Sequence, residues 1–161
     1  MNKINTELDD LSKYKPASDK FEFRQFPFYW LVRVSNAYIM KIEKSLKKLN
    51  INSTSWRIML ILREEGALSV TDIAAHAVAK MPTITKSTYK LQVDGLVRIK
   101  TSDNDGRVSI VVLTDKGAEA VSNIINSTQK AFEHIYDGLS ANEIEQLNLV
   151  LKKLFVNLDT Y

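Results

Sequence analysis

Hydrophobic residues recur every three to four positions in three long stretches of the chain. The first stretch covers 26–48, and the other two cover 115–136 and 140–158. This spacing places the apolar side chains on one face of an α-helix. The last stretch opens with Ser140 and Glu143, which have the spacing of a helix-capping box. Amphipathic helices need cover for their apolar faces, so we expect these three to pack on one another and on a second copy of the chain.

The middle of the chain has a pattern of shorter segments. Helices are predicted over 56–65, 70–78 and 82–94. Their ends carry residues that usually start or stop a helix: the hydroxyls of 53–55 and Ser69 as N-caps, Pro82 in a first turn, and Gly66 and Gly95 as stops. The sequence therefore predicts three short helices in succession.

Two runs rich in Val and Ile follow these helices. They cover 96–101 and 108–113 and predict β-strands, and Leu68 suits a further short strand. The hexapeptide 102–107 between them is composed of turn-forming residues, so the two runs form a β-hairpin. Thr114 then caps the next long helix.

This order of elements divides the chain into parts. Residues 1–20 are expected to form a polar N-terminal arm, and residues 54–113 hold the short helices and the hairpin. Residues 21–53 and 114–161 then form a helical dimerisation region. The expected fold class is mainly α with a small β-hairpin: a winged helix-turn-helix domain plus a helical dimerisation domain.

Composition excludes several classes of site. The 161 residues contain no cysteine, which removes disulfides, thiolate metal sites and cysteine nucleophiles. His76 and His134 are far apart, and no glycine-rich phosphate loop is present, so we expect no metal, no cofactor and no enzymatic activity. No apolar run is long enough to cross a membrane and no signal peptide is recognisable, which predicts a cytoplasmic protein.

The third short helix carries the candidate DNA-binding surface. The formal net charge of the chain is only +3, but Lys80 to Lys100 contains five cations and the single acid Asp94. Small hydroxyls and lysines suit base edges and phosphates in a major groove. The candidate contacts on this helix are Thr83, Thr85, Lys86, Ser87, Tyr89 and Lys90.

The hairpin tip is a second candidate DNA contact. Arg107 can enter an adjacent minor groove, where a narrow groove concentrates negative potential. Asp105 is expected to orient the Arg107 guanidinium through a bidentate pair.

Several motifs in this chain resemble those of the MarR family of bacterial regulators. They are Trp56–Leu62, Leu68–Ala74, Thr83–Lys86, Asp94–Val97, Asp105–Arg107 and Leu113–Gly117, and the resemblance covers about 26–158. It implies a homodimer whose first, fifth and sixth helices dimerise, a recognition helix at about 82–94 and a wing at about 101–108. Met81-Pro82 departs from the small polar residues common in the family.

The resemblance also implies a small phenolic or carboxylic ligand between the dimerisation helices and the DNA-binding domain. The aromatic start at Phe26–Arg33 looks like a subgroup associated with catabolism of aromatic acids. Aromatic walls and one cation suit a small aromatic carboxylic acid. The candidate ligand-binding residues are Tyr29, Trp30 and Arg33 on one helix and Trp56, Arg57 and Met59 on the opposite wall.

These observations lead to one hypothesis and three alternatives. The chain is interpreted as a dimeric repressor that binds double-stranded DNA at a pseudo-palindromic operator, with half-site centres about 10 bp apart, and that an aromatic carboxylate releases. The alternatives are a winged-helix module that binds protein without DNA, a small-molecule-binding protein or enzyme with a vestigial DNA domain, and a transcriptional activator of the same fold.

Overall fold

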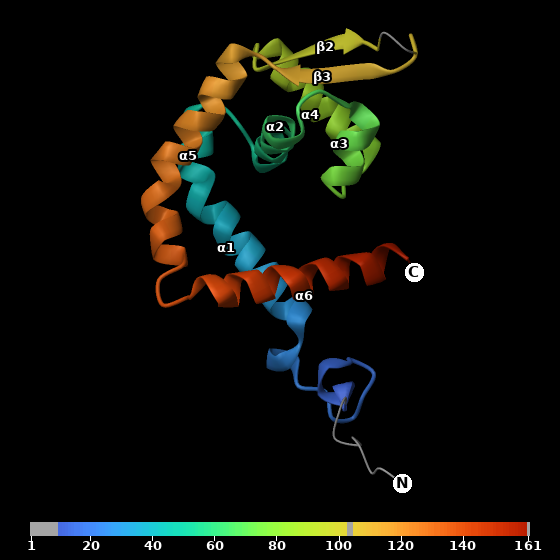
Figure 1. Cartoon of the computed structure of the whole chain (residues 1–161), viewed down its shortest axis with the longest axis vertical. Helices are drawn as coiled ribbons and strands as arrows, with labels where there is room; N and C mark the ends of the chain where they lie inside the picture. The colour runs from blue at the N-terminus through green and yellow to red at the C-terminus, as the bar shows by residue number, and fades with distance from the viewer. Residues whose placement is uncertain (1–9, 103–104, 161) are drawn as a thin grey trace. The chain divides into compact units, whose positions relative to one another are not determined.

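The computed structural model describes residues 10–102 and 105–160 (Figure 1). The chain forms two compact units, Met1–Ile124 and Ile125–Tyr161. Its elements in order are the 3₁₀ turns η1 (Leu11–Tyr14) and η2 (Phe23–Gln25), α1 (Pro27–Lys48), α2 (Ser53–Glu65), β1 (Leu68–Ser69), α3 (Val70–His76), α4 (Met81–Val93), β2 (Val97–Thr101), β3 (Ser109–Leu113), α5 (Asp115–Ile135) and α6 (Ala141–Asp159).

The predicted element order is confirmed. Residues 1–9 of the predicted arm, 103–104 of the hairpin tip and Tyr161 lie outside the described residues. The division into an arm, a DNA-binding domain and a dimerisation region stays a prediction.

The core of the first unit lies between the short helices and the sheet. Helices α2, α3 and α4 pack against one another, and strands β2 and β3 lie along one side of them (Figure 1). The side chains that fill this core are fully buried: Ile58, Met59, Ile73, Ile84 and Val111. Leu91 of α4 and Leu96, which follows this helix, are also buried, so α4 packs on the core through one side.

Two helix ends differ from the predicted ones by more than one residue. Helix α2 begins at Ser53, not at Trp56, because the Asn52 side chain is the N-cap and accepts a hydrogen bond from the Ser55 amide at 2.8 Å. Helix α3 ends at His76, not at Val78, because Val78 adopts a positive φ of 48°. A β-branched residue is strained at a positive φ. At Val78 this backbone conformation allows a short turn between α3 and α4.

The sheet within the described residues has three antiparallel strands in the order β1-β3-β2. The predicted hairpin pairs Val97 with Leu113 and Thr101 with Ser109. The short strand predicted at Leu68 is also present and pairs with Val111 of β3. Strand β3 is therefore the central strand, with β1 on one side and β2 on the other. The side chain of its Val111 is fully buried.

The start of α5 is bonded to the turn between α4 and β2. The Thr114 hydroxyl donates to the Gly95 carbonyl oxygen at 2.8 Å and accepts from the Gly117 amide at 3.0 Å. The Thr114 amide donates to the Leu96 carbonyl oxygen at 3.1 Å. The predicted cap at Thr114 is thus confirmed, and the same side chain joins α5 to the helix-turn-helix.

The second unit contains the end of α5 and all of α6. The predicted capping box at the start of α6 is confirmed, because the Glu143 amide donates to the Ser140 hydroxyl oxygen at 3.3 Å and the Ser140 amide donates to the Glu143 carboxylate at 2.8 Å. The Ser140 hydroxyl also donates to this carboxylate, at 2.7 Å. The hydrogen bonds to this carboxylate, first that of the Ser140 amide, lower the pKa of Glu143 below its usual value.

Within 10–102 and 105–160, no helix is both long and apolar enough to cross a membrane.

Candidate nucleic-acid interface and ligand site

Helix α4 presents most of its predicted DNA-contacting side chains to solvent. Thr83, Thr85 and Lys86 are exposed, and 65% of the Tyr89 surface is exposed. Ser87 and Lys90 are half-buried on the flank that faces α2. The first turn of α4 contains no acidic residue. The exposed surface of this helix therefore offers hydroxyls and ammonium groups.

A cleft of about 510 Å³ separates α4 from the start of α2. Its lining residues come from α4 and from the N-cap and first turn of α2: Asn52, Thr54, Pro82, Thr83, Lys86, Ser87 and Lys90. The lining includes two lysines and three hydroxyl side chains, but no carboxylate. Among the described residues, no carboxylate forms an ion pair with either lysine. The cleft is therefore electropositive.

Lys90 has a contact that its position in the sequence did not indicate. Its ammonium group donates a hydrogen bond to the Asn50 carbonyl oxygen at 2.8 Å. Asn50 lies in the turn between α1 and α2 and has a positive φ of 55°. Lys90 thus holds α4 to the α1–α2 turn, and its charge is fixed in the wall of the cleft.

The hairpin tip differs from the prediction in one contact. Asp105 and Arg107 are both exposed, as expected for a wing. However, the Asp105 carboxylate accepts from the backbone amide of Arg107 at 2.9 Å, and no ion pair with the guanidinium is found among the described residues. The prediction of a bidentate pair is therefore wrong: Asp105 stabilises the turn instead, and the guanidinium remains available for another partner.

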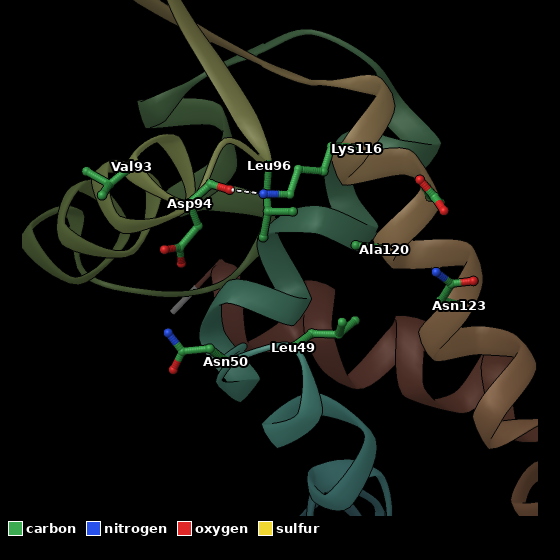
Figure 2. A pocket seen from close by; sticks show the side chains of 9 residues that line it. Leu49, Asn50, Val93, Asp94, Leu96, Lys116, Ala120 and Asn123 are labelled. Atoms are coloured by element: carbon green, nitrogen blue, oxygen red, sulfur yellow. Dashed lines mark hydrogen bonds between the residues drawn. The ribbon is translucent and has the colours of Figure 1, made fainter.

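A second cavity, of about 550 Å³, lies where the α1–α2 turn, the end of α4 and the start of α5 meet (Figure 2). Figure 2 shows the Lys116 side chain reaching across its edge to the Asp94 carbonyl oxygen, a hydrogen bond of 2.8 Å. Leu49, Leu96 and Ala120 contribute apolar side chains to the lining. Lys116 thus gives α4 a second hydrogen-bonded contact, this one with α5.

Three of the predicted ligand residues lie together at the start of α1. The Arg33 guanidinium carbon lies 5.3 Å from the ring centroid of Tyr29 and 5.9 Å from that of Trp30. The two rings are 5.0 Å apart in an edge-on arrangement, and the Trp30 indole donates to the Arg24 carbonyl oxygen at 2.7 Å. No carboxylate among the described residues pairs with Arg33. The cluster therefore consists of two aromatic rings in contact with each other and the Arg33 guanidinium, which has no carboxylate partner among the described residues.

The other three predicted ligand residues do not join this cluster. Met59 is fully buried in the core, so the expectation that it lines the ligand site is wrong for this structure. The indole of Trp56 is also buried and donates to the Tyr38 hydroxyl at 3.2 Å, while Arg57 donates to the Ala77 carbonyl oxygen at 3.1 Å. Tyr38 lies nine residues after Tyr29, which is roughly 13 Å along a helix. Among the described residues, the polar groups of Trp56 and Arg57 thus bond to Tyr38 and Ala77 and not to the cluster of Tyr29, Trp30 and Arg33.

The sequence reasoning did not identify three residues beside α4: Thr54, Asn50 and Lys116. The sequence indicates Thr54 only as a helix cap and Lys116 only as part of a family motif. The hydrogen bonds of Asn50 and Lys116 join positions 40 and 22 residues apart, and Thr54 lines a cleft with residues of α4 that are at least 28 positions away, so no local pattern could reveal these neighbours. In the described parts of the chain, no three His, Cys, Asp or Glu side chains are placed to hold a metal ion.

Comparisons with known proteins agree with this architecture. The MarR family model matches residues 51–109. The HTH-type transcriptional repressor IacR of Pseudomonas putida is 40% identical over 149 residues, which cover 92% of this chain and 89% of the relative. The HTH-type transcriptional regulator FarR of Neisseria gonorrhoeae is 30% identical over 129 residues, covering 80% of this chain and 85% of FarR.

A solved structure is similar over nearly the same span. The structure of NadR in complex with 4-hydroxyphenylacetate has a TM-score of 0.74 and 25% sequence identity, and the match covers 87% of this chain and 97% of that one. Together with the relative that is 40% identical over almost the whole chain, this match supports the predicted winged-helix fold. The chain belongs to the MarR family of transcriptional regulators.

Proposed function

We propose that this chain is a homodimeric, sequence-specific DNA-binding repressor that a small aromatic carboxylate releases from its operator. The observation that carries this proposal is the exposed surface of α4, where hydroxyls and lysines lie beside an electropositive cleft without any carboxylate. A helix of this kind fits the major groove of B-DNA, and its side chains meet base edges there. We further propose that the protein acts in the cytoplasm, by binding DNA and not by catalysis.

The operator contacts are assigned from the exposed positions. Thr83, Thr85, Lys86 and Tyr89 face solvent on α4, and Arg107 stands at the wing with its guanidinium unpaired among the described residues. The recognition helix reads the major groove, and Arg107 reaches the adjacent minor groove. Two copies related by a two-fold axis read half-sites about 10 bp apart.

Dimerisation is supported by an apolar stripe on α6. Leu147, Val150 and Leu158 are each more than half exposed and recur at helical spacing, with Leu151 and Leu154 half-buried between them. An apolar stripe of this length is unfavourable in water, and a second copy of the same helix region would cover it. The resemblance to the MarR family implies the same assembly.

The ligand proposal rests on the cluster at the start of α1. Arg33 lies over two aromatic rings and has no carboxylate partner among the described residues, so its N–H groups are free to bind a carboxylate in a bidentate manner. NadR, which is 25% identical, binds 4-hydroxyphenylacetate, an aromatic carboxylate. We therefore propose Tyr29, Trp30 and Arg33 as ligand contacts, whereas Trp56 packs in the core and Arg57 bonds to the Ala77 carbonyl oxygen.

Release from DNA requires that the ligand prefer a conformation that does not fit the operator. Helix α4 is bonded to the α1–α2 turn by Lys90 and to the start of α5 by Lys116. A shift of α1 on ligand binding would therefore be transmitted to α4 through the Asn50 carbonyl. This route couples the aromatic cluster to the recognition helix.

The first experiment measures binding of the full chain to its own upstream DNA by fluorescence anisotropy, over a range of salt concentrations. Operator DNA should bind more tightly than scrambled DNA, and affinity should fall steeply with salt because phosphate contacts release counterions. Adding 4-hydroxyphenylacetate or another aromatic carboxylate should release the operator. Binding without sequence preference or salt dependence would reject the proposal in favour of a protein-binding module.

A reporter gene then separates repression from activation. The operator is placed upstream of the reporter, with and without the regulator. Lower expression in the presence of the regulator, restored by the acid, is expected. Higher expression would instead assign an activator with the same DNA-binding surface.

A further inference from the structure

We infer that the cleft between the start of α2 and α4 holds one phosphate group of the DNA backbone, with the Thr54 hydroxyl and the Lys86 ammonium as its contacts. This inference rests on the proposed DNA-binding function and adds α2 to the interface. It also gives the two sides of α4 different tasks. The side facing the cleft anchors the backbone, and the opposite side reads bases.

The chemistry of the cleft selects an anion. Lys86 and Lys90 contribute positive charge, and Thr54, Thr83 and Ser87 contribute hydroxyl groups that can donate hydrogen bonds. A tetrahedral phosphate accepts several such bonds at once, and bonds between charged and polar groups are the stronger kind. A volume of about 510 Å³ admits a phosphate group together with the adjoining sugar atoms.

The positive charge in the cleft wall is held in place. The Lys90 ammonium is fixed by the Asn50 carbonyl oxygen at 2.8 Å, and it neutralises no carboxylate of the described residues. The Asn52 side chain is occupied as the cap of α2 through its bond to the Ser55 amide. Of the groups that line the cleft, Thr54 is the hydroxyl contributed by α2 and Lys86 is the lysine that is not already bonded, so both can turn toward an occupant, as can the hydroxyls of Thr83 and Ser87.

The position of the cleft on α4 points to DNA as the source of the phosphate. Thr83, Ser87 and Lys90 recur at intervals of four and three residues and so share one side of the helix. Thr85 and Tyr89, four residues apart, lie on a different side and are exposed. A helix seated in the major groove has base edges before it and a sugar–phosphate backbone along its flank. The cleft occupies such a flank.

The test compares Thr54→Val and Lys86→Gln with the unaltered protein, on operator and scrambled DNA. Each variant should lose roughly tenfold affinity for both DNAs, since a hydrogen bond to a charged group is removed. Lys86→Gln should also lower the salt slope by about one for each half-site. Thr85→Ala, by contrast, should lower the ratio of operator to scrambled affinity.

A DNA series identifies the phosphate directly. Operators carry one neutral methylphosphonate at successive backbone positions. One position in each half-site should weaken the unaltered protein by roughly tenfold, and that same position should have less than a twofold effect on the variant that carries both Thr54→Val and Lys86→Gln. If every position weakens this variant as much as the unaltered protein, no phosphate occupies the cleft.

Matched controls separate this inference from loss of fold and from the proposed function. Thr54→Ser keeps the hydroxyl and should keep the affinity, and Lys152→Gln removes one exposed charge from α6 and should keep the salt slope. Thermal unfolding checks that each variant folds.

Operator binding that is unchanged by Thr54→Val and Lys86→Gln would overturn the inference alone, whereas absence of operator preference in the unaltered protein would overturn the proposed function. If the double variant keeps its DNA affinity but loses release by an aromatic acid, the cleft binds the effector carboxylate, and the inference is wrong.

Discussion

Replacing Gly117 with alanine is expected to destabilise the junction between α5 and the β2 strand. Gly117 is buried in the first turn of α5, and a Cβ atom added there would lie 2.0 Å from the Leu96 carbonyl oxygen and 3.0 Å from the Leu113 Cδ2 atom. Real Cβ atoms essentially never approach another atom within 3.0 Å. The Leu96 backbone would therefore have to move by at least about 1 Å, a displacement that a well-packed interior resists.

The size of the effect follows from three contributions. Forcing an extra methyl group into a packed region costs typically about 1–3 kcal/mol. Moving the Leu96 carbonyl also weakens its bond from the Thr114 amide, which is worth about 0.5–1.5 kcal/mol. Replacing glycine with alanine in a helix returns up to about 1 kcal/mol. The free energy of unfolding should therefore fall by about 1–3 kcal/mol, which corresponds to roughly 3–10 °C in the unfolding midpoint for a chain of this size.

Thermal unfolding followed by circular dichroism at a fixed protein concentration measures this change. The concentration must be fixed because dimerisation raises the apparent stability by mass action. Gly106→Ala is the matched control, since a Cβ at Gly106 meets nothing within 4 Å and its φ is not positive; its midpoint should stay within about 2 °C. A Gly117→Ala protein as stable as the unaltered chain would refute the steric reasoning.

Three further predictions concern the wing, the ligand cluster and the start of α6. Arg107→Ala should weaken operator binding by about 1–3 kcal/mol in anisotropy; unchanged affinity at physiological salt would reject its groove contact. Arg33→Gln should leave operator binding intact but raise the concentration of aromatic carboxylate needed for release by roughly tenfold, and normal release would exclude Arg33 from the ligand site. Folding lowers the pKa of Glu143 because Ser140 donates hydrogen bonds to its carboxylate. The ionised Glu143 side chain therefore stabilises the fold at pH values above its pKa in the unfolded chain, and this stabilisation is lost as the pH falls through its lower pKa in the folded protein. The unfolding midpoint of the unaltered chain should therefore fall relative to that of Glu143→Gln as the pH drops below about 4.5; a constant difference between pH 7 and pH 3 would contradict this.

The predicted ligand site shows where reasoning from the sequence succeeds and where it stops. The i,i+3 and i,i+4 spacing brought Tyr29, Trp30 and Arg33 together correctly, because side-chain neighbours within one helix depend only on helical geometry. Placing Met59 opposite them required knowledge of how α2 rotates against α1. In the folded chain the Met59 side chain is buried in the core instead, because burying an apolar side chain stabilises the protein.

The same contrast applies to the wing. The residues of 102–107 indicated a turn, and the structure confirms one around Asp105 and Arg107. The partner of the Asp105 carboxylate was predicted wrongly because an aspartate in a turn has two competing donors nearby. The backbone amide two residues on is held by the turn itself, whereas the guanidinium loses side-chain freedom if it is fixed.

By itself, the sequence determined the order of helices and strands, most of their ends to within one residue and the polar surface of α4. These features depend on hydrophobic spacing, on caps such as Ser69 and on the Ser140–Glu143 box, all of which act over a few residues. Only the tertiary structure decided the cleft at Thr54 and the two hydrogen bonds that hold α4 to its neighbours, that of Lys90 with Asn50 and that of Lys116 with Asp94. Each joins residues that are distant in the chain, and such contacts form because buried apolar faces bring whole helices together, which no local pattern records.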